Sequence, residues 1–307
     1  MSSRPRPSRA YEWPTLCLAA VTYALWAAIT YFAQSLGPLL SILLLIPLIT
    51  LHSSLQHETL HLIEPRWKIF GQMLVFPALG LAIPYIRFRD SHLIHHKNEN
   101  LTDPYDDPES NYMVKEVWTT LPHWLQGILT FNNTLAGRLL LGPLIGQIMF
   151  MRGDWQQIRR GNHAVLNGWL AHIPAVALVL FWLMTLGTMP LWAYAIAAYF
   201  GLSILKIRTF LEHRAHTQPN GRSVIVEDRG ILSLLFLNNN FHAVHHAHPQ
   251  VAWYNLPACY RENKAKYLGE NRKYRYDNYR TVFRKFFLHG KEPVQHPLWS
   301  LENRHDR

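Results

Sequence analysis

Residues 36–61 read LGPLLSILLLIPLITLHSSLQHETLH, and the architecture of the protein can be worked out from this segment. Its first part lacks charged residues and is rich in Leu and Ile, as is typical of a helix that crosses a lipid bilayer. Its end carries His57 and His61, a spacing that places both imidazoles on one face of a helix. We therefore predict one long helix that projects past the bilayer and presents histidines there.

Three further apolar segments extend this prediction. Residues 13–33 carry no charge and are long enough to cross the hydrocarbon core of a bilayer, which is about 30 Å thick. This segment exceeds the apolar region of a typical signal peptide and further spans follow it, so we interpret it as a retained helix. We predict four transmembrane helices in two hairpins, at about residues 13–33, 36–56, 168–186 and 189–207.

The composition of the 307-residue chain indicates spans joined to a substantial polar part. Hydrophobic residues make up 49% and charged residues 16%, against roughly 25% charged residues in soluble domains. The mean hydropathy of −0.06 is too low for a chain that lies entirely in the membrane. We expect an all-α integral membrane protein with a single domain over residues 1–307, whose helical cap at 57–167 and 208–307 carries the histidines.

The distribution of basic residues predicts how the chain is oriented in the membrane. Arg4, Arg6 and Arg9 precede the first span, and Lys206 and Arg208 mark the end of the last one. Lys and Arg are enriched on the cytoplasmic side of membrane proteins. We therefore expect a multi-pass protein of the inner membrane, with both termini and the histidine-bearing cap on the cytoplasmic side.

The apolar segment 69–88 needs a different interpretation, because Pro and Gly residues interrupt it. If it crossed the membrane, it would carry the histidines at 92–96 to the side opposite His57 and His61. Histidines on opposite sides could not form one site. We therefore predict that residues 69–88 dip into the membrane or lie flat on it, and that the apolar residues 139–151 form an interfacial or packed helix.

Histidine clusters are the most unusual feature of this sequence, which contains 18 His. Residues at positions i and i+4, or at i, i+3 and i+4, share one face of a helix, so several imidazoles can converge on one ion. No single cluster supplies enough ligands, so several clusters must meet in space. The clustered residues are His57 and His61 in HETLH, His92, His95 and His96 in HLIHH, His213 and His216 in EHRAH, and His242, His245 and His246 in HAVHH.

The ligand types limit the metal that such a site binds. Imidazole suits iron, copper, zinc and nickel, while two cysteines, Cys17 and Cys259, exclude a thiolate-based site and a disulfide framework. One zinc ion takes about four ligands, so this many histidines indicates two ions. Several acidic residues beside the clusters are candidates to orient the imidazole N–H groups: Glu58, Asp90, Asp103, Asp106, Asp107 and Glu212.

Three consecutive asparagines, Asn238, Asn239 and Asn240, precede the last triplet. We expect them to cap the helix that carries this triplet or to polarise a water molecule. His172 lies within a predicted span, where an ionisable side chain is costly. The sequence leaves open whether His172 or His216 contributes to the site.

HETLH, HLIHH and HAVHH resemble the three histidine boxes of the membrane fatty-acid desaturase and hydroxylase superfamily, over roughly residues 40–260. The resemblance implies four spans, boxes on the cytoplasmic face, and a non-haem di-iron centre that uses O₂ to attack an unactivated C–H bond of a lipid chain. In that superfamily one more ligand follows the last span, and His213 matches its position after Glu212. The implied ligands of the two iron ions are His57, His61, His92, His95, His96, His213, His242, His245 and His246.

The resemblance also implies the kind of reaction, namely oxidation of a fatty acyl chain. We expect desaturation of a fatty acid or an acyl lipid. Hydroxylation of an acyl or alkyl chain and decarboxylation of a fatty acid to a terminal alkene remain alternatives. The ligand set does not choose among them, because the position of the substrate in the cavity decides the outcome.

Such a reaction needs electrons from a partner. Little sequence follows the third box, so we expect a separate donor of ferredoxin or rubredoxin type, with its reductase, rather than a fused haem-binding domain. The basic segment 261–285 would dock an acidic donor or contact anionic lipid headgroups. A net charge of +10 also suits nucleic acid, but we find no recognition motif for it, and the predicted spans argue against it.

Two other classes of protein fit part of the pattern. HETLH matches the HExxH motif of zinc proteases, with His57 and His61 as ligands and Glu58 as general base, but this leaves both HxxHH triplets unexplained. A metal transporter would hold its ligands near the middle of the bilayer, whereas these clusters lie outside the apolar segments. Metal content distinguishes the zinc protease from an oxygen-dependent enzyme, because one zinc ion favours the protease and two iron ions favour the enzyme.

Overall fold

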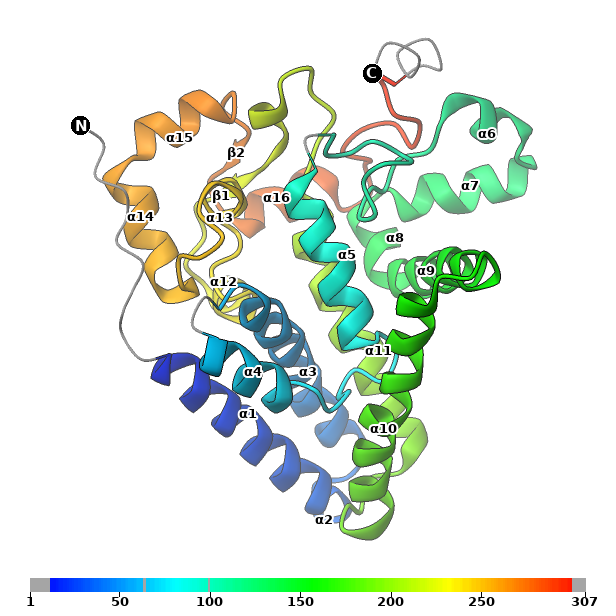
Figure 1. Ribbon diagram of the computed structural model, residues 1–307, viewed down its shortest axis with the longest axis vertical. Coiled ribbons are helices and arrows are strands. Elements are labelled where there is room, and N and C mark those ends of the chain that lie inside the picture. Colours follow the sequence, from blue (N-terminus) through cyan, green and yellow to red (C-terminus); the bar gives the residue numbers. More distant parts are fainter. Residues whose placement is uncertain (1–11, 63–64, 99, 300–307) are drawn as a thin grey trace.

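The computed structural model describes residues 12–62, 65–98 and 100–299. Four of its helices are long and apolar enough to cross a membrane, which confirms the predicted number of spans. A short helix, α2 (Ala33–Leu36), joins the first two, and Figure 1 shows the four together in the lower part of the molecule. The four helices form two hairpins and are α1 (Trp13–Tyr31), α3 (Pro38–Leu60), α10 (His163–Thr185) and α11 (Leu191–Thr209).

Helix α3 packs against α11, and this contact brings one helix of each hairpin together. A Cβ atom added to Gly201 would lie 2.8 Å from Ile49 Cγ2, so the missing side chain lets the two helices approach closely. Thr50 Oγ1 donates a hydrogen bond of 2.8 Å to the Gly201 carbonyl across the same contact. The pairing fixes the end of α3, with its HETLH motif, beside the end of α11.

Buried hydrogen bonds also connect the two hairpins. Trp26 Nε1 donates to the Tyr194 hydroxyl at 3.0 Å, and that hydroxyl donates to the Leu79 carbonyl at 2.9 Å. Trp182 Nε1 donates to Thr30 Oγ1 at 2.9 Å. Lipid tails cannot accept or donate hydrogen bonds, so polar groups at this depth need partners within the protein. These bonds therefore set how the hairpins pack.

As we predicted, the segment 69–88 does not form a helix that crosses the membrane. Helix α4 (Pro65–Leu74) ends early, residues 75–84 are not helical, and α5 (Tyr85–Lys97) begins after them. The non-helical residues insert among the spans: the Ala78 amide donates to the Ala175 carbonyl at 3.1 Å. His172 Nε2 donates to the Leu81 carbonyl at 2.8 Å, so His172 supports this inserted loop.

The remaining elements form a cap over one end of the spans (Figure 1). The predicted helix at 139–151 is interrupted by a break at residue 141, and its second part continues to residue 159. Two short strands, β1 (Ile225–Val226) and β2 (Arg275–Tyr276), pair in parallel. The other elements are α6 (Lys115–Thr120), α7 (His123–Asn132), α8 (Leu135–Leu140), α9 (Gly142–Arg159), η1 (Pro219–Arg222), α12 (Ile231–Leu235), α13 (His242–Ala247), η2 (Trp253–Asn255), α14 (Leu256–Glu262), α15 (Lys264–Glu270) and α16 (Tyr279–Phe286).

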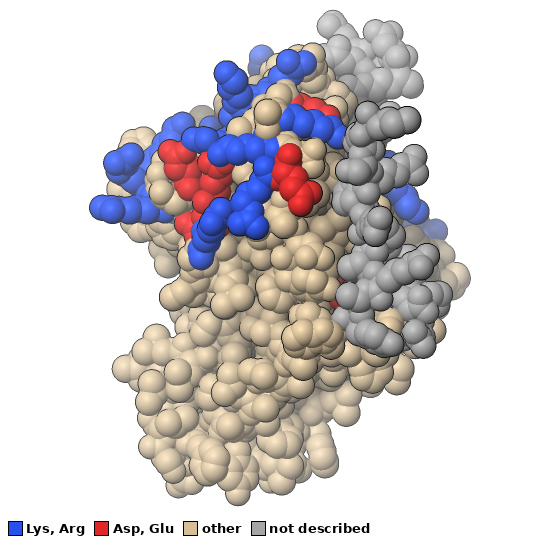
Figure 2. Space-filling view, turned by 90° about the vertical axis from the view of Figure 1, so that its left-hand side faces the viewer, with Lys and Arg blue, Asp and Glu red and all other residues tan. Residues whose placement is uncertain are grey.

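The surface divides into an apolar part and a charged part. Figure 2 shows Lys and Arg gathered over the upper part of one face, whereas the lower part of that face carries no charged side chain among the residues described. Large apolar side chains on the spans are exposed, including Leu39 (69%), Phe181 (67%) and Met184 (72%). An apolar surface of this kind is expected where lipid covers the protein.

Candidate metal centre

Nine histidines converge at the junction of the spans and the cap, and they divide into two groups. Within each group the ligand atoms lie within 4.8 Å of one another, close enough for several of them to hold one ion. His216 belongs to neither group among the residues described, and His172 contacts the inserted loop instead. The first group is His57, His61, His92, His96 and His245, and the second is His95, His213, His242 and His246.

Each HxxHH triplet contributes to both groups. On α5, His92 and His96 enter the first group and His95 the second. On α13 the assignment is reversed, because His245 enters the first group while the outer two histidines of that triplet enter the second. His213 comes from the chain just after α11, where a bridge to Ser223 holds its backbone. Two short helices that face each other thus build two adjacent sites.

The donor set fits metal ions. His61 Nε2 lies in the first group and His246 Nε2 in the second, and both atoms are buried without a hydrogen-bond partner among the residues that the structure describes. His95 Nε2 and His242 Nε2 each lie 3.0 Å from His213 Nε2. Nitrogen atoms that face one another in a buried space are well placed to share a cation, and imidazole is a ligand for iron.

Burial also keeps most of these imidazoles neutral, as metal binding requires. Burial, together with the nearby His92 and Lys68, lowers the pKa of His61 to about 3. Burial and neighbouring histidines lower the pKa of His96 to about 2. The same two causes lower the pKa of His245 and His246 well below the ordinary value. These side chains therefore present lone pairs rather than charges at neutral pH.

Two carboxylates in the loop after α5 contact histidines of that helix. His92 Nδ1 donates to Glu109 Oε1 at 2.9 Å, and His95 Nδ1 donates to Asp107 Oδ1 at 2.7 Å. Burial opposes protonation of His95, but the negative charges of Glu109 and Asp107 raise its pKa to about 9. Burial alone would raise the pKa of the Glu109 carboxyl, but His92 and His95 hold it well below its usual range.

Polar residues also support the histidines at the other side of the centre. His242 Nδ1 donates to Asn239 Oδ1 at 3.1 Å and lies 3.7 Å from Glu212 Oε1. Arg208 Nε forms an ion pair of 2.9 Å with that Glu212 oxygen. His213 Nδ1 lies 3.2 Å from Ser223 Oγ. Partners of this kind fix the orientation of metal-binding imidazoles and leave the opposite ring nitrogen free for the ion.

The structure shows which of the six acidic candidates lie beside histidines of the centre. Asp107 and Glu212 lie beside histidines of the centre, whereas the other four have different partners. Glu58 accepts from the Trp253 amide, and Asp90 pairs with Arg89. Asp103 accepts from the Tyr105 and Asp106 amides, and the carboxylate of Asp106 accepts from Asn100.

The structure adds one residue to the site and corrects one prediction. The sequence did not indicate Glu109, although this residue lies in the acidic loop that follows the second histidine box. The expected capping by asparagine is wrong, because the residue before α13 is Phe241 and no side chain caps that helix. Asn239 instead contacts His242, and its neighbour Asn240 donates to the Val226 carbonyl at 2.6 Å.

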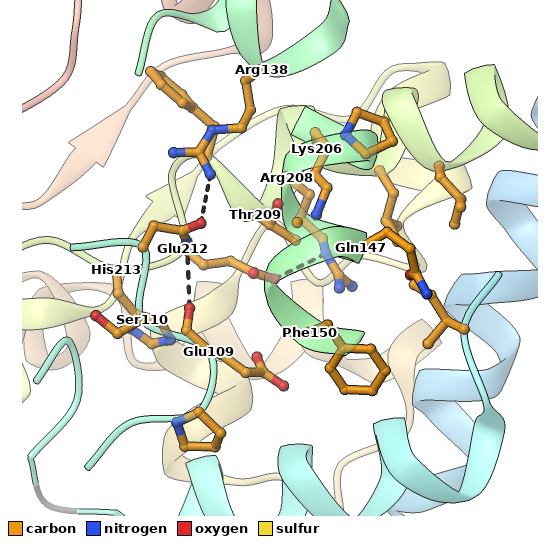
Figure 3. Close-up of a pocket in the computed structure, with 18 of the residues that line it drawn as sticks. Glu109, Ser110, Arg138, Gln147, Phe150, Lys206, Arg208, Thr209, Glu212 and His213 are labelled. Atoms are coloured by element: carbon orange, nitrogen blue, oxygen red, sulfur yellow. Dashed lines mark hydrogen bonds and ion pairs between the residues drawn. The ribbon is translucent and has the colours of Figure 1, made fainter. Parts of the chain in front are cut away.

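A cavity of about 270 Å³ lies against this centre. His92, His213 and Glu109 line it beside the metal groups. Figure 3 shows charged side chains of α8 and α11 around it, together with Phe150 and Gln147 of α9. Apolar residues of the inserted loop, of α5 and of the spans form another part of its wall: Ala78, Gly80, Leu81, Ile83, Phe88, Leu202 and Leu205.

The fold and the centre together define a helical membrane protein with a double metal site made of histidine. The sequence profile of the family described as "Fatty acid desaturase" matches residues 33–278. The chain belongs to this family of di-iron oxidoreductases, which confirms the predicted family and enzyme class. A search among curated proteins gave no match.

Proposed function

We propose that this chain is a single desaturase domain over residues 1–307 that uses O₂ to oxidise a fatty acyl chain, most simply by desaturation. The two adjacent groups of buried histidines carry the proposal, since together they contain nine imidazoles suited to two iron ions. Iron held there would supply O₂ activation and the removal of hydrogen from an unactivated C–H bond. The proposed ligands are His57, His61, His92, His95, His96, His213, His242, His245 and His246.

The chain's own residues have three roles in this proposal. Glu109 and Asp107 orient His92 and His95 through their Nδ1 atoms. Burial of the histidines would exclude bulk water from the metals. The apolar wall of the adjacent cavity holds the acyl chain beside the metals. The position of the substrate in the cavity would determine the product: loss of a second hydrogen gives a double bond, addition of a hydroxyl group gives an alcohol, and loss of the carboxyl group gives a terminal alkene.

The alternatives from other classes have less support. A zinc protease would need the Glu58 carboxylate at the metal, but Glu58 Oε1 accepts a hydrogen bond of 3.1 Å from the Trp253 amide. A transporter would need its ligands within the spans. The histidines lie instead at one end of α3 and in the cap, and the family match supports an oxidoreductase.

Electrons would come from a separate ferredoxin- or rubredoxin-type protein and its reductase. The basic segment 261–285 is a docking surface of suitable charge for an acidic donor, and its Lys and Arg side chains are exposed. Some of this charge is already paired, since Lys264 and Arg275 both contact Glu227. We place this surface and both termini in the cytoplasm, with the spans in the inner membrane, because basic residues follow the spans on this side.

Metal analysis and product analysis test the function together. His95→Ala and His245→Ala should remove iron and activity while membrane insertion is retained, and His289→Ala, an exposed histidine outside both groups, is the matched control. Membranes incubated with labelled fatty acids, O₂, ferredoxin, reductase and NADPH should yield an oxidised acyl product. Full activity of both variants, or one zinc ion in place of two irons, would contradict the proposal.

A further inference from the structure

The cavity beside the metal centre is lined by four carboxylates and four basic side chains, and the carboxylates are already paired or hydrogen-bonded. Asp107 and Glu109 contact histidines, as described above. Glu212 pairs with Arg208 at 2.9 Å, and Glu292 Oε2 lies 3.6 Å from Lys291 Nζ. All four carboxylates line the cavity and each already has a contact, and among the described residues none forms an ion pair with the other two basic residues there.

Those two residues are Arg138 of α8 and Lys206 in the last turn of α11. Among the described residues, neither forms an ion pair with a carboxylate. Within the described part of the chain, Arg138 donates to neutral groups, namely to the Asn132 carbonyl at 3.1 Å and to Asn111 Oδ1 at 2.6 Å. Burial lowers the pKa of Arg138 to about 10, which still leaves it charged at neutral pH.

Two glycines of α9 make room for these cations. A Cβ atom at Gly142 would lie 3.0 Å from Arg138 Cδ and 3.4 Å from Lys206 Cγ. A Cβ atom at Gly146 would lie 3.2 Å from Lys206 Nζ. Figure 3 shows Lys206 directed toward the cavity from α11. The two side chains are therefore held near each other at its wall.

We propose that Arg138 and Lys206 bind the carboxylate of a free fatty acid, whose apolar chain lies along the cavity wall. This inference rests on the proposed function and specifies its substrate class. A buried cation without a partner is costly, and an anionic ligand removes that cost. On α11, Leu202 lies one turn before Lys206, so the helix presents an apolar surface next to the cation, as an amphipathic ligand requires.

The volume of the cavity favours a carboxylate over a larger anionic headgroup. The volume of about 270 Å³ is slightly below the range of about 300–1,000 Å³ found for ligand sites. Little space therefore remains for a coenzyme or a phospholipid headgroup in addition to the acyl chain.

Binding measurements on the full chain test this without turnover. We would incorporate the iron-loaded protein into nanodiscs of neutral phosphatidylcholine, exclude O₂, and titrate with hexadecanoate or its methyl ester. The wild-type protein should bind the acid at least about tenfold more tightly than the ester, a difference of about 1.4 kcal/mol. Lys206→Met and Arg138→Gln should abolish this preference, whereas Arg152→Gln, an exposed α9 residue outside the cavity, should retain it.

Stability separates ligand binding from a structural role. Lys206→Met removes a cation without depriving any carboxylate of an ion-pair partner. It should therefore raise the unfolding temperature of the ligand-free protein while it weakens fatty-acid binding. A lower unfolding temperature with an unchanged acid preference would mean that Lys206 is only structural. Equal affinity of the wild type for acid and ester would overturn the inference. If the wild type bound acid and ester equally but still oxidised an esterified lipid, the inference would fail and the proposed oxidation would stand. If the protein preferred the acid but formed no oxidised product, the proposed function would be contradicted and the inference about binding would stand.

Discussion

His95 Nδ1 donates a hydrogen bond of 2.7 Å to Asp107 Oδ1, and both residues are buried. The other oxygen of Asp107 accepts from the Thr102 amide at 2.8 Å, and Oδ1 also accepts from the Glu109 amide at 2.9 Å. One carboxylate thus orients a histidine of the second metal group and holds the loop that carries Glu109. Because Glu109 contacts His92 of the first group, Asp107 links both groups.

We expect Asp107→Asn to weaken metal binding in both groups. Loss of a partner of a ligating histidine typically lowers metal affinity or activity by about 10- to 100-fold. Iron per chain, measured after dialysis, and the rate of O₂-dependent product formation check this. Asp277→Asn is the control, since Asp277 is exposed and far along the chain from the centre. Unchanged iron content in Asp107→Asn would show that Asp107 does not support the ligands.

Glu109→Gln should have a comparable effect on His92, because glutamine keeps the shape of the side chain but loses its charge. We expect about 10- to 100-fold weaker metal binding for this variant as well. Since Asp107 positions the Glu109 amide, the effects of the two substitutions should not be additive in the double variant. Glu116→Gln on the exposed side of α6 is the control. Additive losses would mean that the two carboxylates act independently.

Metal loading should depend on pH through His95. Its pKa is raised to about 9, so in the metal-free protein this imidazole is protonated at neutral pH and must lose the proton to bind metal. Protonated His95 stabilises the metal-free fold below its ordinary pKa, and that contribution is lost as the pH rises through 9. Metal affinity should therefore fall about tenfold per unit of decreasing pH below that value. Glu109→Gln removes the largest contribution that raises this pKa, so a titration of metal affinity should show its dependence displaced to lower pH.

The sequence predicted the four spans and the clusters of histidines because both are local patterns, whereas His213 became a proposed ligand only through the resemblance to the family. A charge-free apolar segment such as 13–33 is recognised from length alone, and HETLH shows its spacing directly. The division of each triplet between two groups could not be predicted, since it depends on how α5 and α13 face each other. Glu109 escaped for the same reason: a loop folds it back onto His92, and no spacing in the sequence records that contact.

The ion pair of Arg87 and Asp154 should be important for the position of the second histidine box. Arg87 Nε and Nη2 donate to the two oxygens of Asp154 at 2.9 and 2.8 Å, which fixes α5 against α9. Trp169 Nε1 of α10 donates to the same carboxylate at 2.8 Å. Arg87→Met leaves Asp154 buried without its cation, and we expect a loss of about 3–5 kcal/mol. Thermal unfolding in detergent measures this, and Arg87→Met/Asp154→Asn should recover part of the loss. Equal stability of Arg87→Met and the wild type would contradict the assignment.

The close approach of α3 and α11 gives a prediction about the spans themselves. A Cβ atom at Gly201 would lie 2.8 Å from Ile49 Cγ2 and 3.3 Å from the Ile46 carbonyl oxygen. Gly201→Ala should therefore separate the two helices, weaken the Thr50 hydrogen bond and cost about 1–3 kcal/mol through overpacking. Gly153→Ala in α9 is the matched control, because a Cβ atom there meets nothing within 4 Å and alanine favours a helix. Unfolding temperatures of the two variants in the same detergent compare them directly.

Since α3 carries His57 and α11 leads into His213, Gly201→Ala should also lower iron content, whereas Gly153→Ala should retain it. If both variants kept the stability and iron content of the wild type, the contact between α3 and α11 would not position the metal ligands.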